Sequence, residues 1–494
     1  MRAKEPDEGI TVTKKENFSE WYTQIVNKAE LADIRFGIQG FIVHRPWGFF
    51  LIKKIYEYLE AAVEAQGHLP FLFPSVVKEE NLHKEKEHAG FTPNVFWVSE
   101  AGDKKIEERF ALRPTGEAQI YPLYALWFRS HKDLPFKGYQ SRIPAFRNEM
   151  TTRPFLRGRE FMFFETHDVF NTHEEALEQI EQDLATCKHV IEEKVHIPFF
   201  YFQRPQWDKF KGADNTYTPD TIMPDGKRNQ LASTHDLGQN FSKAFTIKVK
   251  GKDEKDQFAW QTCFGPGVWR IMAALIGIHG DDKGLIIPFD MAPVQIVVIP
   301  ILFAGKADEG KEVLSFCRQV VKTLTNKGYR VTLDDSSESP GYKYNKWEMK
   351  GVPVRLEIGP KETKAKTVSA ALRTKEKRTS FVLADLTIEI AHAAATIDKD
   401  IHARAEAYFA HNVRSVDTLD TLKKTLHTHR GFVTVPFCSV DFDGEKCSDV
   451  LKAETDGGNV CGTLYPEEDR VKQGQICIIC KKEANHLVYV AKSY

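Results

Sequence analysis

A change of pattern near residue 290 is the feature that most constrains the fold. From there onward, apolar runs typical of buried strands alternate with helical segments. Strands that alternate with helices at these lengths predict a small, mainly parallel α/β domain. The elements expected in it are strands at 294–301, 329–335 and 352–358 and helices at 308–328 and 342–351.

The length and composition are those of a folded protein with several domains. The chain has 494 residues, and about three domains fit that length at roughly 150 residues each. Hydrophobic residues make up 42% of the chain, too many for a mostly disordered one. The formal net charge is −1, which gives no overall attraction to nucleic acid, so a polyanion must bind a local patch.

Two segments bear on where the protein works. The apolar stretch at 292–304 is too short to cross a membrane and is broken by prolines. Residues 1–8 mix basic with acidic side chains and lead into no apolar segment, so we expect no secretory signal. We therefore expect a cytoplasmic protein without a membrane partner.

The part of the chain before residue 290 mixes helices with strands. Residues 46–66 carry apolar side chains at helical spacing, and residues 69–77 are typical of a buried strand with Pro74 at an edge. A helix that runs into such a strand offers a surface for a symmetric partner. Residues 138–168 predict two strands joined by an exposed basic loop.

That pair of strands carries the first candidate for chemistry. Arg147 and Glu149 lie on it, and the loop adds Arg153, Arg157 and Arg159. Guanidinium groups match phosphate oxygens in pairs, and a carboxylate can accept a hydrogen bond from an exocyclic amine. The pattern favours a cradle for a polyphosphate, although a solvated basic hairpin explains it about equally well.

A second candidate opens a later helix. Gly265 and Gly267 permit a close approach of backbone to a nucleotide, and Arg270 follows within reach of a phosphate. Alone, this pattern is more often a structural turn. The nucleotide-binding interpretation becomes stronger when this pattern is taken together with the basic pair of strands.

The order of these features resembles the three signature motifs of class II aminoacyl-tRNA synthetases. The finer match is to prolyl-tRNA synthetases of the eukaryotic and archaeal type, over residues 15–494. The segments that carry this resemblance are RPTGE at 113–117, PFLRGREF at 154–161, THDLGQNF at 234–241, GVPVRLEIGP at 351–360 and the final Ser493 and Tyr494.

The resemblance implies a fold, a partner and an activity. The expected domains are an α+β catalytic domain on an antiparallel sheet at 15–288, an α/β anticodon-binding domain at 289–395 and a small α+β zinc-binding domain at 396–494. It implies a homodimer through the first motif around Pro74. The activity is ATP-dependent, Mg²⁺-assisted activation of L-proline to prolyl-adenylate, followed by transfer to the 3′ end of tRNA(Pro).

The resemblance also implies site residues, position by position. Arg147 would bridge the proline carboxylate and the α-phosphate and, with Arg270, carry catalysis by positioning and charge neutralisation. Glu149 would bind the adenine amino group and Phe161 would stack on the adenine. The ATP set is Arg147, Glu149, Arg159, Phe161, Gln230, Ser233 and Arg270, and the proline set is Thr115, Glu117, Arg147, Phe163 and His235.

Plainer explanations exist for three of these residues. His235 and Phe163 suit an ordinary core, and Glu117 is an acid at a helix N-terminus, where the dipole favours it. The implied pocket nevertheless suits proline. Its secondary ammonium needs a carboxylate and a hydroxyl as acceptors, and its pyrrolidine ring needs an apolar wall. Phe163 replaces a more usual Trp, and the third motif around Cys263 is richer in glycine than is usual in the nearest family members.

A basic patch lies in the middle domain. Residues 343–378 hold eleven Lys or Arg against four Glu, within an otherwise neutral chain. Such runs are usually solvated surface, but this one resembles the family's anticodon-binding domain, where single-stranded bases are read. The candidates for base contacts are Arg355, Glu357 and Lys361.

The cysteines gather at the end of the chain. Cys438, Cys447 and the C-x-x-C pair Cys477 and Cys480 suit a closed tetrahedral zinc site, and the family's terminal domain carries one. Cys461 could replace Cys447.

The spacing and the motifs also limit the function. Only 95 residues separate His167 from Cys263, so we expect no large editing insertion between these motifs. A threonyl or histidyl synthetase is an alternative, but it should lack the segments at 113–117 and 234–241. A non-catalytic RNA-binding paralogue is another, and the intact Arg147 and Arg270 disfavour it.

Overall fold

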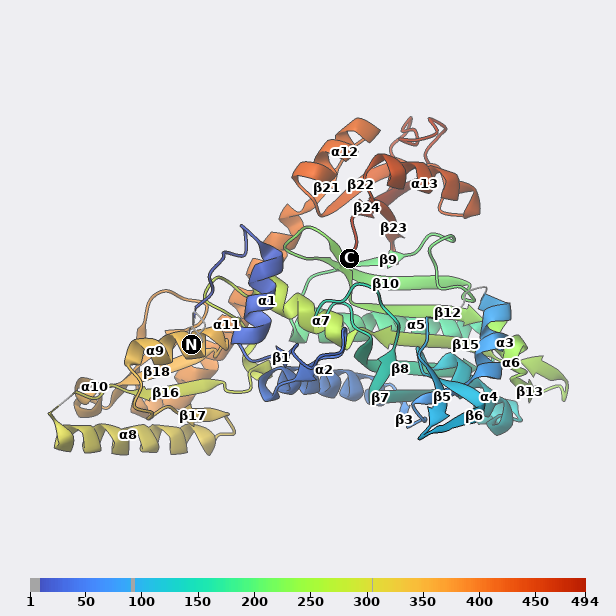
Figure 1. The fold of residues 1–494 in the computed structure, drawn as a ribbon. Coiled ribbons are helices and arrows are strands. Elements are labelled where there is room, and N and C mark those ends of the chain that lie inside the picture. The colour runs from blue at the N-terminus through green and yellow to red at the C-terminus, as the bar shows by residue number, and fades with distance from the viewer. Residues whose placement is uncertain (1–8, 90–93, 304) are drawn as a thin grey trace.

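The computed structural model describes residues 9–89, 94–303 and 305–494. Residues 1–8, on which the expectation about a secretory signal rests, and the end of the apolar stretch at 304 lie outside them. Figure 1 shows three arms, with the catalytic domain at the lower right, an α/β domain at the lower left and the C-terminal domain above.

The N-terminal segment forms the first helices of the catalytic domain. The predicted helix at 46–66 is confirmed: Pro46 occupies its first turn, and an apolar stripe along it is buried. The elements are α1 (Phe18–Lys28), β1 (Ala32–Asp33), β2 (Val43–His44) and α2 (Pro46–Ala65).

The buried strand predicted at 69–77 is wrong. β3 (Leu69–Pro70) is an edge strand parallel to β7, and β4 (Val76–Lys78) belongs to a separate sheet. Between them the chain is irregular, and Leu72 is 80% exposed. Proline has no N–H to donate to a ladder, so Pro70 and Pro74 interrupt a strand that the apolar pattern favoured.

An antiparallel sheet is the base of the catalytic domain. The two strands predicted around the basic loop are confirmed as β7 and β8, and the glycine-rich strand that leads into a helix is confirmed as β15 with α7. In order across the sheet after β3 come β7 (Phe136–Phe146), β8 (Glu160–Phe170), β15 (Trp260–Pro266), β12 (Ala232–Gly238), β10 (Asn215–Ile222) and β9 (Phe200–Gln203), while β11 (Arg228–Gln230) pairs with β10.

Helices and small sheets surround this sheet. The Glu-rich segment after β8 forms α5 with a capping box at Thr172 and continues as a π-helical turn, Lys188–Lys194. The surrounding elements are α3 (Glu79–Ala89), β5 (Trp97–Ala101), β6 (Lys104–Leu112), α4 (Glu117–Trp127), α5 (His173–Cys187), α6 (Asn240–Phe245), β13 (Lys248–Lys250), β14 (Asp256–Phe258) and α7 (Val268–Ala274).

The α/β domain has its own five-stranded sheet. Its first three strands are parallel, as the alternating pattern predicts, and two antiparallel strands complete it. The strand order is β17 (Val331–Leu333), β16 (Ile296–Pro300), β18 (Val354–Ile358), β19 (Thr367–Leu372) and β20 (Thr379–Val382), and the helices are α8 (Ala307–Thr325), α9 (Pro340–Met349), α10 (Pro360–Ala365) and α11 (Leu386–His411). α11 runs without a break across residues 395 and 396, where the second domain limit was predicted.

The C-terminal domain extends the catalytic sheet. β23 pairs with β9, with Thr463 opposite Gln203, so the two domains share one twelve-stranded sheet. No pattern in the sequence predicts this pairing, because the residues of an edge strand do not indicate which strand will pair with it. The elements are β21 (Val413–Ser415), α12 (Leu419–Thr428), β22 (Phe432–Phe437), α13 (Glu445–Glu454), β23 (Asn459–Leu464) and β24 (His486–Ala491).

Within the part of the chain that the structure describes, no helix combines the length and apolarity needed to cross a bilayer.

Candidate functional site

A cavity of about 450 Å³ opens on one face of the catalytic sheet. β8, β15, β12 and β10 form its floor, and the loop after β7 and the starts of α4 and α7 form its walls. All the predicted ATP and proline residues except Arg159 line it, namely Thr115, Glu117, Arg147, Glu149, Phe161, Phe163, Gln230, Ser233, His235 and Arg270.

Strand alternation places one wall of side chains. Successive residues of a strand point to opposite faces, so every second residue of β8 reaches the cavity. These residues are Phe161, Phe163, Glu165 and His167. The first two were predicted, and the same alternation from Phe163 was the signal that could have found Glu165 and His167.

Sheet register brings three further side chains into a row. Cys263 of β15 lies opposite His167 of β8 on one side and opposite His235 of β12 on the other. Ser233 lies opposite Gly265 in the same way. Residues far apart in the chain therefore meet on one face, which fixes Cys263 as part of the cavity floor.

Gly116 lets the start of α4 close on this floor. A Cβ atom at Gly116 would lie 2.5 Å from the Glu165 carboxylate and 2.7 Å from His167 Nε2. Any larger residue would push α4 away, and Glu117, its first residue, would leave the cavity.

A buried ion pair neutralises one of the two carboxylates. Arg113, fully buried, donates to Glu165, and His167 Nε2 lies 3.1 Å from the other Glu165 oxygen. Burial raises the pKa of Glu165, but Arg113 and His167 outweigh it and bring this pKa to about 2. Glu165 is therefore ionised, and its charge is balanced within the protein.

Glu117 offers the other carboxylate to the cavity. It is 5% exposed, and its Oε2 atom is buried without a hydrogen-bond partner among the residues that the structure describes. Its Oε1 accepts from Cys263 Sγ at 3.7 Å. Ligand atoms of Glu117, His167 and Cys263 lie within 4.8 Å of one another. A buried, unsatisfied carboxylate of this kind calls for a cationic or donor group of a ligand.

His235 forms a neutral wall beside it. Its Nδ1 is 2.9 Å from Thr216 Oγ1, and its ring is 4.7 Å from that of Phe210. Burial, reinforced by His167 and Arg204, lowers the pKa of His235 to about 3, so the ring is uncharged at neutral pH. A neutral imidazole does not repel a bound ammonium group.

Positive charge gathers at the other end of the cavity. Arg147, Arg157 and Arg270 all line it, and the Arg147 guanidinium lies 5.8 Å from the Phe161 ring. Burial first, and repulsion from Arg147 and Arg157 second, lower the pKa of Arg270 to about 10. Arg270 stays protonated at neutral pH, and a bound polyanion would relieve this repulsion.

Arg157, and not Arg159, reaches the cavity. Arg159 Nε donates to the carbonyl of Glu149 at 2.9 Å, which turns its side chain toward the backbone of the loop. Arg157 Nη1 lies 3.8 Å from the Glu149 carboxylate. Because both belong to one basic loop, residue type alone could not separate the two arginines.

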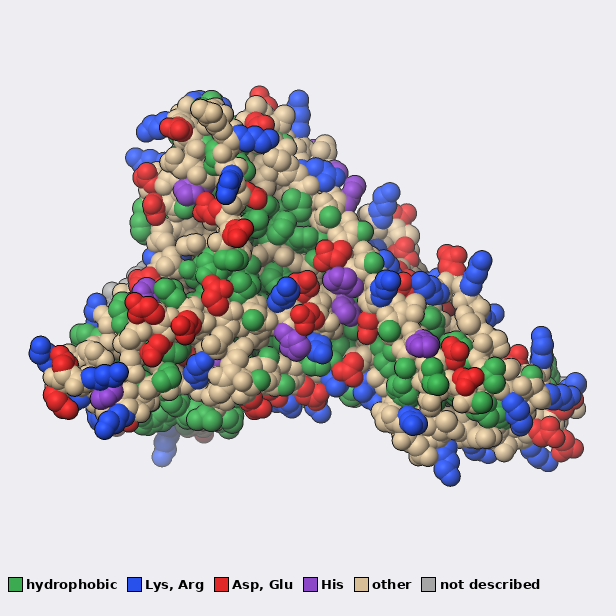
Figure 2. Space-filling view, turned by 180° about the vertical axis from the view of Figure 1, so that it is seen from behind, with side chains coloured by type: hydrophobic (Ala, Val, Ile, Leu, Met, Phe, Trp, Pro, Cys, Tyr) green, Lys and Arg blue, Asp and Glu red, His purple; other side chains and the backbone are tan. Residues whose placement is uncertain are grey.

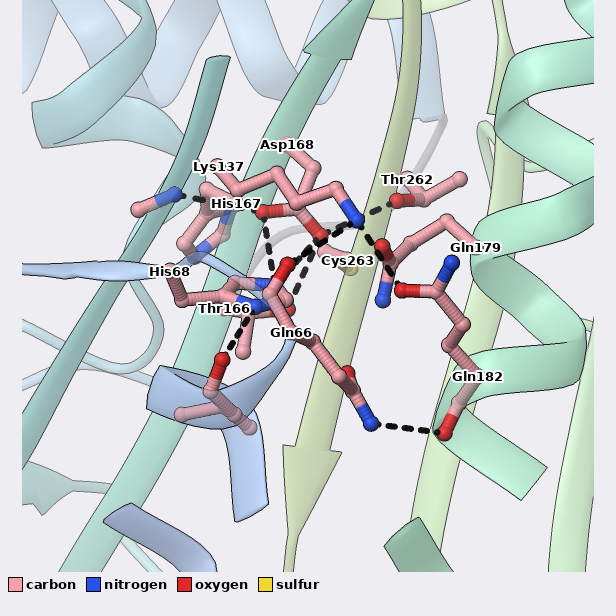
Figure 3. A network of polar contacts seen from close by, with 12 residues as sticks. Gln66, His68, Lys137, Thr166, His167, Asp168, Gln179, Gln182, Thr262 and Cys263 are labelled. Carbon is pink, nitrogen blue, oxygen red and sulfur yellow. Dashed lines mark hydrogen bonds and ion pairs between the residues drawn. The ribbon is translucent and has the colours of Figure 1, made fainter. Parts of the chain in front are cut away.

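A second polar network lies on the opposite face of the sheet (Figure 3). Asp168 is fully buried there, 3.2 Å from His68 Nε2, and accepts from Thr166 and Thr262. Asp183 of α5 accepts from Thr234 of β12 and, at 2.9 Å, from Gln179. Burial and the neighbouring Asp168 raise the pKa of Asp183 from 3.8 to about 7.

The raised pKa of Asp183 predicts a stability that falls as the pH rises. The folded chain keeps a proton on Asp183 that the unfolded chain releases above its pKa of 3.8, so stability decreases between about pH 4 and pH 7. Asp183→Asn mimics the protonated group. Its advantage over wild type in free energy of unfolding should therefore grow by about 2 kcal/mol from pH 5 to pH 8. Urea denaturation at both pH values measures it, and an equal difference at both would contradict the raised pKa.

Four thiols meet in the C-terminal domain. Cys438 follows β22, Cys447 lies in α13, and Cys477 and Cys480 precede β24, yet their sulfur atoms all lie within 4.8 Å of one another. Cys438 and Cys447 Sγ are 3.7 Å apart. Zinc bound at about 2.3 Å to four sulfurs gives a tetrahedron with edges of about 3.8 Å, so the thiols fit that ion. Cys461 is buried elsewhere and donates to the carbonyl of Asn459.

Two of the three predicted anticodon residues line a cavity of about 670 Å³ on the α/β domain. Glu357 and Lys361 line it together with Phe303, which is 57% exposed. Arg355 does not line it, and its guanidinium lies 4.1 Å from the Tyr344 ring and 3.0 Å from Glu357. Much of the counted positive charge is therefore paired inside the domain.

Comparison with known families defines the class of protein. Residues 96–279 match the family described as tRNA synthetase class II core domain (G, H, P, S and T), and residues 295–398 match the anticodon binding domain. Residues 419–494 match the prolyl-tRNA synthetase C-terminal family. The fold and the site are thus those of a class II aminoacyl-tRNA synthetase.

Similar proteins narrow the class to one family. The proline–tRNA ligase of Thermofilum pendens is 48% identical over 99% of this chain and 100% of its own, and that of Pyrococcus abyssi is 36% identical over 97% and 98%. The Giardia lamblia prolyl-tRNA synthetase solved with prolyl-adenylate superposes with a TM-score of 0.94 at 31% identity, over 98% of this chain and 100% of its own. The Cryptosporidium parvum enzyme solved with L-proline and AMP superposes with a TM-score of 0.91 at 30% identity, over 99% and 97%.

The chain belongs to the prolyl-tRNA synthetase family. It is an ATP-dependent ligase that activates proline and transfers it to tRNA. The threonyl and histidyl alternatives are thereby set aside.

Proposed function

We propose that both steps of the family's reaction take place in the cavity described above, with its acidic floor holding proline and its arginines holding ATP. The observation that carries this proposal is the buried Glu117 Oε2, which has no hydrogen-bond partner within the described part of the chain. The secondary ammonium of proline supplies two N–H donors and a positive charge, which that atom requires. Thr115 adds a hydroxyl beside it, and Phe163 and His235 enclose the pyrrolidine ring.

Because Arg113 and His167 balance Glu165, Glu117 is the residue left to attract the ammonium. Glu165, His167 and Arg113 act as positioning residues that keep the floor rigid. Cys263 fills the space beneath the ammonium site and narrows it. This division of roles explains why two carboxylates occur in a site for one cation.

Replacing Glu117 with Gln tests the proline site. The variant keeps the shape but removes the charge, so the KM for proline should rise about 100-fold while the KM for ATP stays within twofold. ATP–pyrophosphate exchange at varied proline measures both. Glu178→Gln, on the exposed side of α5, is the matched loss of charge and should leave both constants unchanged. A proline KM within twofold of wild type in Glu117→Gln would contradict the assignment.

The arginine end of the active-site cavity binds ATP. There Phe161 stacks on the adenine and Glu149 accepts a hydrogen bond from the adenine amino group, while Gln230 and Ser233 line the nucleotide. Arg147 bridges the proline carboxylate and the α-phosphate, while Arg157 and Arg270 neutralise the remaining phosphates. The proline carboxylate then attacks the α-phosphorus in line, and pyrophosphate leaves on the arginine side. Mg²⁺ would be held mostly by the phosphates. When bound, it adds charge neutralisation.

For tRNA, the exposed Phe303 provides a stacking surface beside Glu357 and Lys361 for an unpaired anticodon base. Arg355 and Arg378 orient Glu357, at 3.0 and 3.1 Å.

The bound zinc would be structural, held by Cys438, Cys447, Cys477 and Cys480. Thiolate ligands of this kind stay reduced in the cytoplasm, which supports that location. The segment between His167 and Cys263 builds strands and helices of the catalytic domain, and we expect no editing there.

We also propose a homodimer through the surface after α2. Leu69 and Leu72 are 56% and 80% exposed, and Leu126 of α4 is 61% exposed. Figure 2 shows hydrophobic side chains along the lower edge of the catalytic domain, where Figure 1 places β3. Large contiguous apolar patches mark protein interfaces, and a second copy of the chain supplies a self-complementary partner.

Leu72→Asp is expected to weaken this dimer. Each copy would lose one buried leucine and gain a charge in an apolar interface, so the dissociation constant should rise about 1,000-fold. Sedimentation equilibrium measures it. Leu302→Asp, an exposed leucine of the α/β domain, is the control and should leave the dimer unchanged. A wild-type chain that sediments as a monomer at micromolar concentration would contradict the proposal.

A further inference from the structure

A second cavity lies where the C-terminal domain meets the catalytic sheet, near the C-terminal end of the chain (Figure 1). Its volume is about 360 Å³. Three segments form it: the turn between β10 and β11, the end of α12 with the residues after it, and the residue that follows β24. Its position at a junction between domains is typical of ligand sites.

The charged groups of this cavity are mostly basic. Lys227, Arg430 and Lys492 line it with His427, against the single carboxylate of Asp225. That carboxylate already accepts from the Tyr494 hydroxyl at 2.7 Å and lies 4.0 Å from Lys227 Nζ. Lys492 Nζ is 3.3 Å from Asp456, whose side chain is fully exposed, and such a surface pair contributes little. The cavity therefore carries an excess of positive charge.

The backbone around Arg430 is held in place. Arg430 has a φ of 60°, a left-handed conformation that is unfavourable for residues other than glycine. A Cβ atom at Gly226 would lie 2.2 Å from Arg430 Cβ, and Gly431 N donates to the Gly226 carbonyl at 3.0 Å. Arg430 Nη1 donates to the main-chain oxygen of Asp225 at 3.2 Å. The two domains thus fix the guanidinium at the cavity.

Tyr494 links this cavity to the ATP end of the active site, because its hydroxyl donates to Asp225 and it lines the small cavity that adjoins the active site. Arg157 and Arg270 line both the active-site cavity and a small adjoining one that is closed by Tyr494. The Tyr494 ring lies 5.0 Å from Lys227 Nζ. A nucleic-acid strand whose 3′ end lies in the active site must cross the protein surface around the opening of that cavity. Each of its nucleotides carries one negative charge. The overall charge of −1 means that local cations have to supply the attraction.

We propose that this cavity binds a backbone phosphate of the tRNA acceptor strand while the terminal ribose occupies the active site. The inference rests on the proposed function, because it takes the active-site cavity as the place of prolyl transfer. Arg430 and Lys492 contact the phosphate, and His427 adds a donor. Such a contact positions the strand and reads no base.

A double variant, Arg430→Asn with Lys492→Gln, tests the proposal. Asparagine tolerates the left-handed backbone, so the wall keeps its shape. Aminoacylation should show a KM for tRNA about tenfold higher, and the slope of log KM against log salt should fall by about 1. Exchange without tRNA should stay within twofold. Lys424→Gln, exposed on α12 outside the cavity, is the control and should change none of these.

A KM for tRNA that is unchanged in the double variant would overturn the proposal. Inorganic phosphate is the second probe: if it raises the melting temperature of wild type but not of the double variant, while the KM for tRNA is unchanged, the cavity binds a free anion instead. Lys492→Gln alone changes only a surface residue, so it tests the proposal even if the double variant misfolds. It should still raise the KM for tRNA about threefold. A wild-type chain without proline-dependent exchange would contradict the proposed function, not this inference.

Discussion

Arg147→Ala is expected to reduce proline-dependent ATP–pyrophosphate exchange about 1,000-fold or more, with the folded chain otherwise intact. Arg147 lines the cavity with the other arginines, and in the proposed function it bridges the proline carboxylate and the α-phosphate. Its charge stabilises the bond-making step more than the bound substrates, because negative charge shifts along the phosphate as the carboxylate attacks. The loss should therefore fall on kcat more than on either KM.

The control for this variant is Arg142→Gln, on β7, five residues before Arg147 in the following loop. Arg142 pairs with Glu60 on the surface, at 2.8 Å, and lies outside the cavity. Exchange in Arg142→Gln should stay within twofold of wild type. Exchange near the wild-type level in Arg147→Ala would refute the role assigned to Arg147.

Cys480→Ser is expected to remove one zinc ion per chain and to destabilise the C-terminal domain by several kcal/mol, about the scale of structural zinc binding. Native mass spectrometry measures the metal, and thermal unfolding measures the stability. Because β23 joins β9 in a shared sheet, loss of zinc should also loosen the edge of the catalytic domain. Exchange should then become more sensitive to heat.

Cys461→Ala is the matched control for the zinc site. Cys461 is buried in β23, away from the four clustered thiols, so its loss should leave the zinc content unchanged. The zinc content of Cys461→Ala distinguishes the ligand set with Cys447 from the alternative set in which Cys461 replaces it. Zinc retained in Cys480→Ser, or lost in Cys461→Ala, would overturn the assignment to Cys438, Cys447, Cys477 and Cys480.

Local patterns predicted most of the architecture and much of the site. Helical spacing identified α2, and strand alternation identified β7 and β8 with the basic loop between them. The strand predicted at 69–77 is wrong, because proline has no N–H to donate to a ladder and β3 ends at Pro70. The exposed leucines there are the basis of the homodimer that we propose. The pairing of β23 with β9 could not be predicted, since it depends on two edges that meet only in the folded chain.

The site residues that sequence reasoning missed share one cause. Glu165, His167 and Cys263 reach the cavity through strand alternation and sheet register. Arg157 and Arg159 could not be told apart by type, and only the loop backbone decides which reaches the cavity. Arg355 stays a candidate for base contact; it pairs with Glu357 and stacks on Tyr344, and it does not line the cavity beside Lys361.

The central claim is that the acidic floor selects proline for activation by ATP. Amino-acid-dependent ATP–pyrophosphate exchange, measured with each of the twenty amino acids on the folded wild-type chain, tests it most directly. The account predicts that proline gives the highest kcat/KM and that Glu117→Gln removes this preference. A folded chain that shows no exchange with proline above background, or that prefers another amino acid, would contradict it.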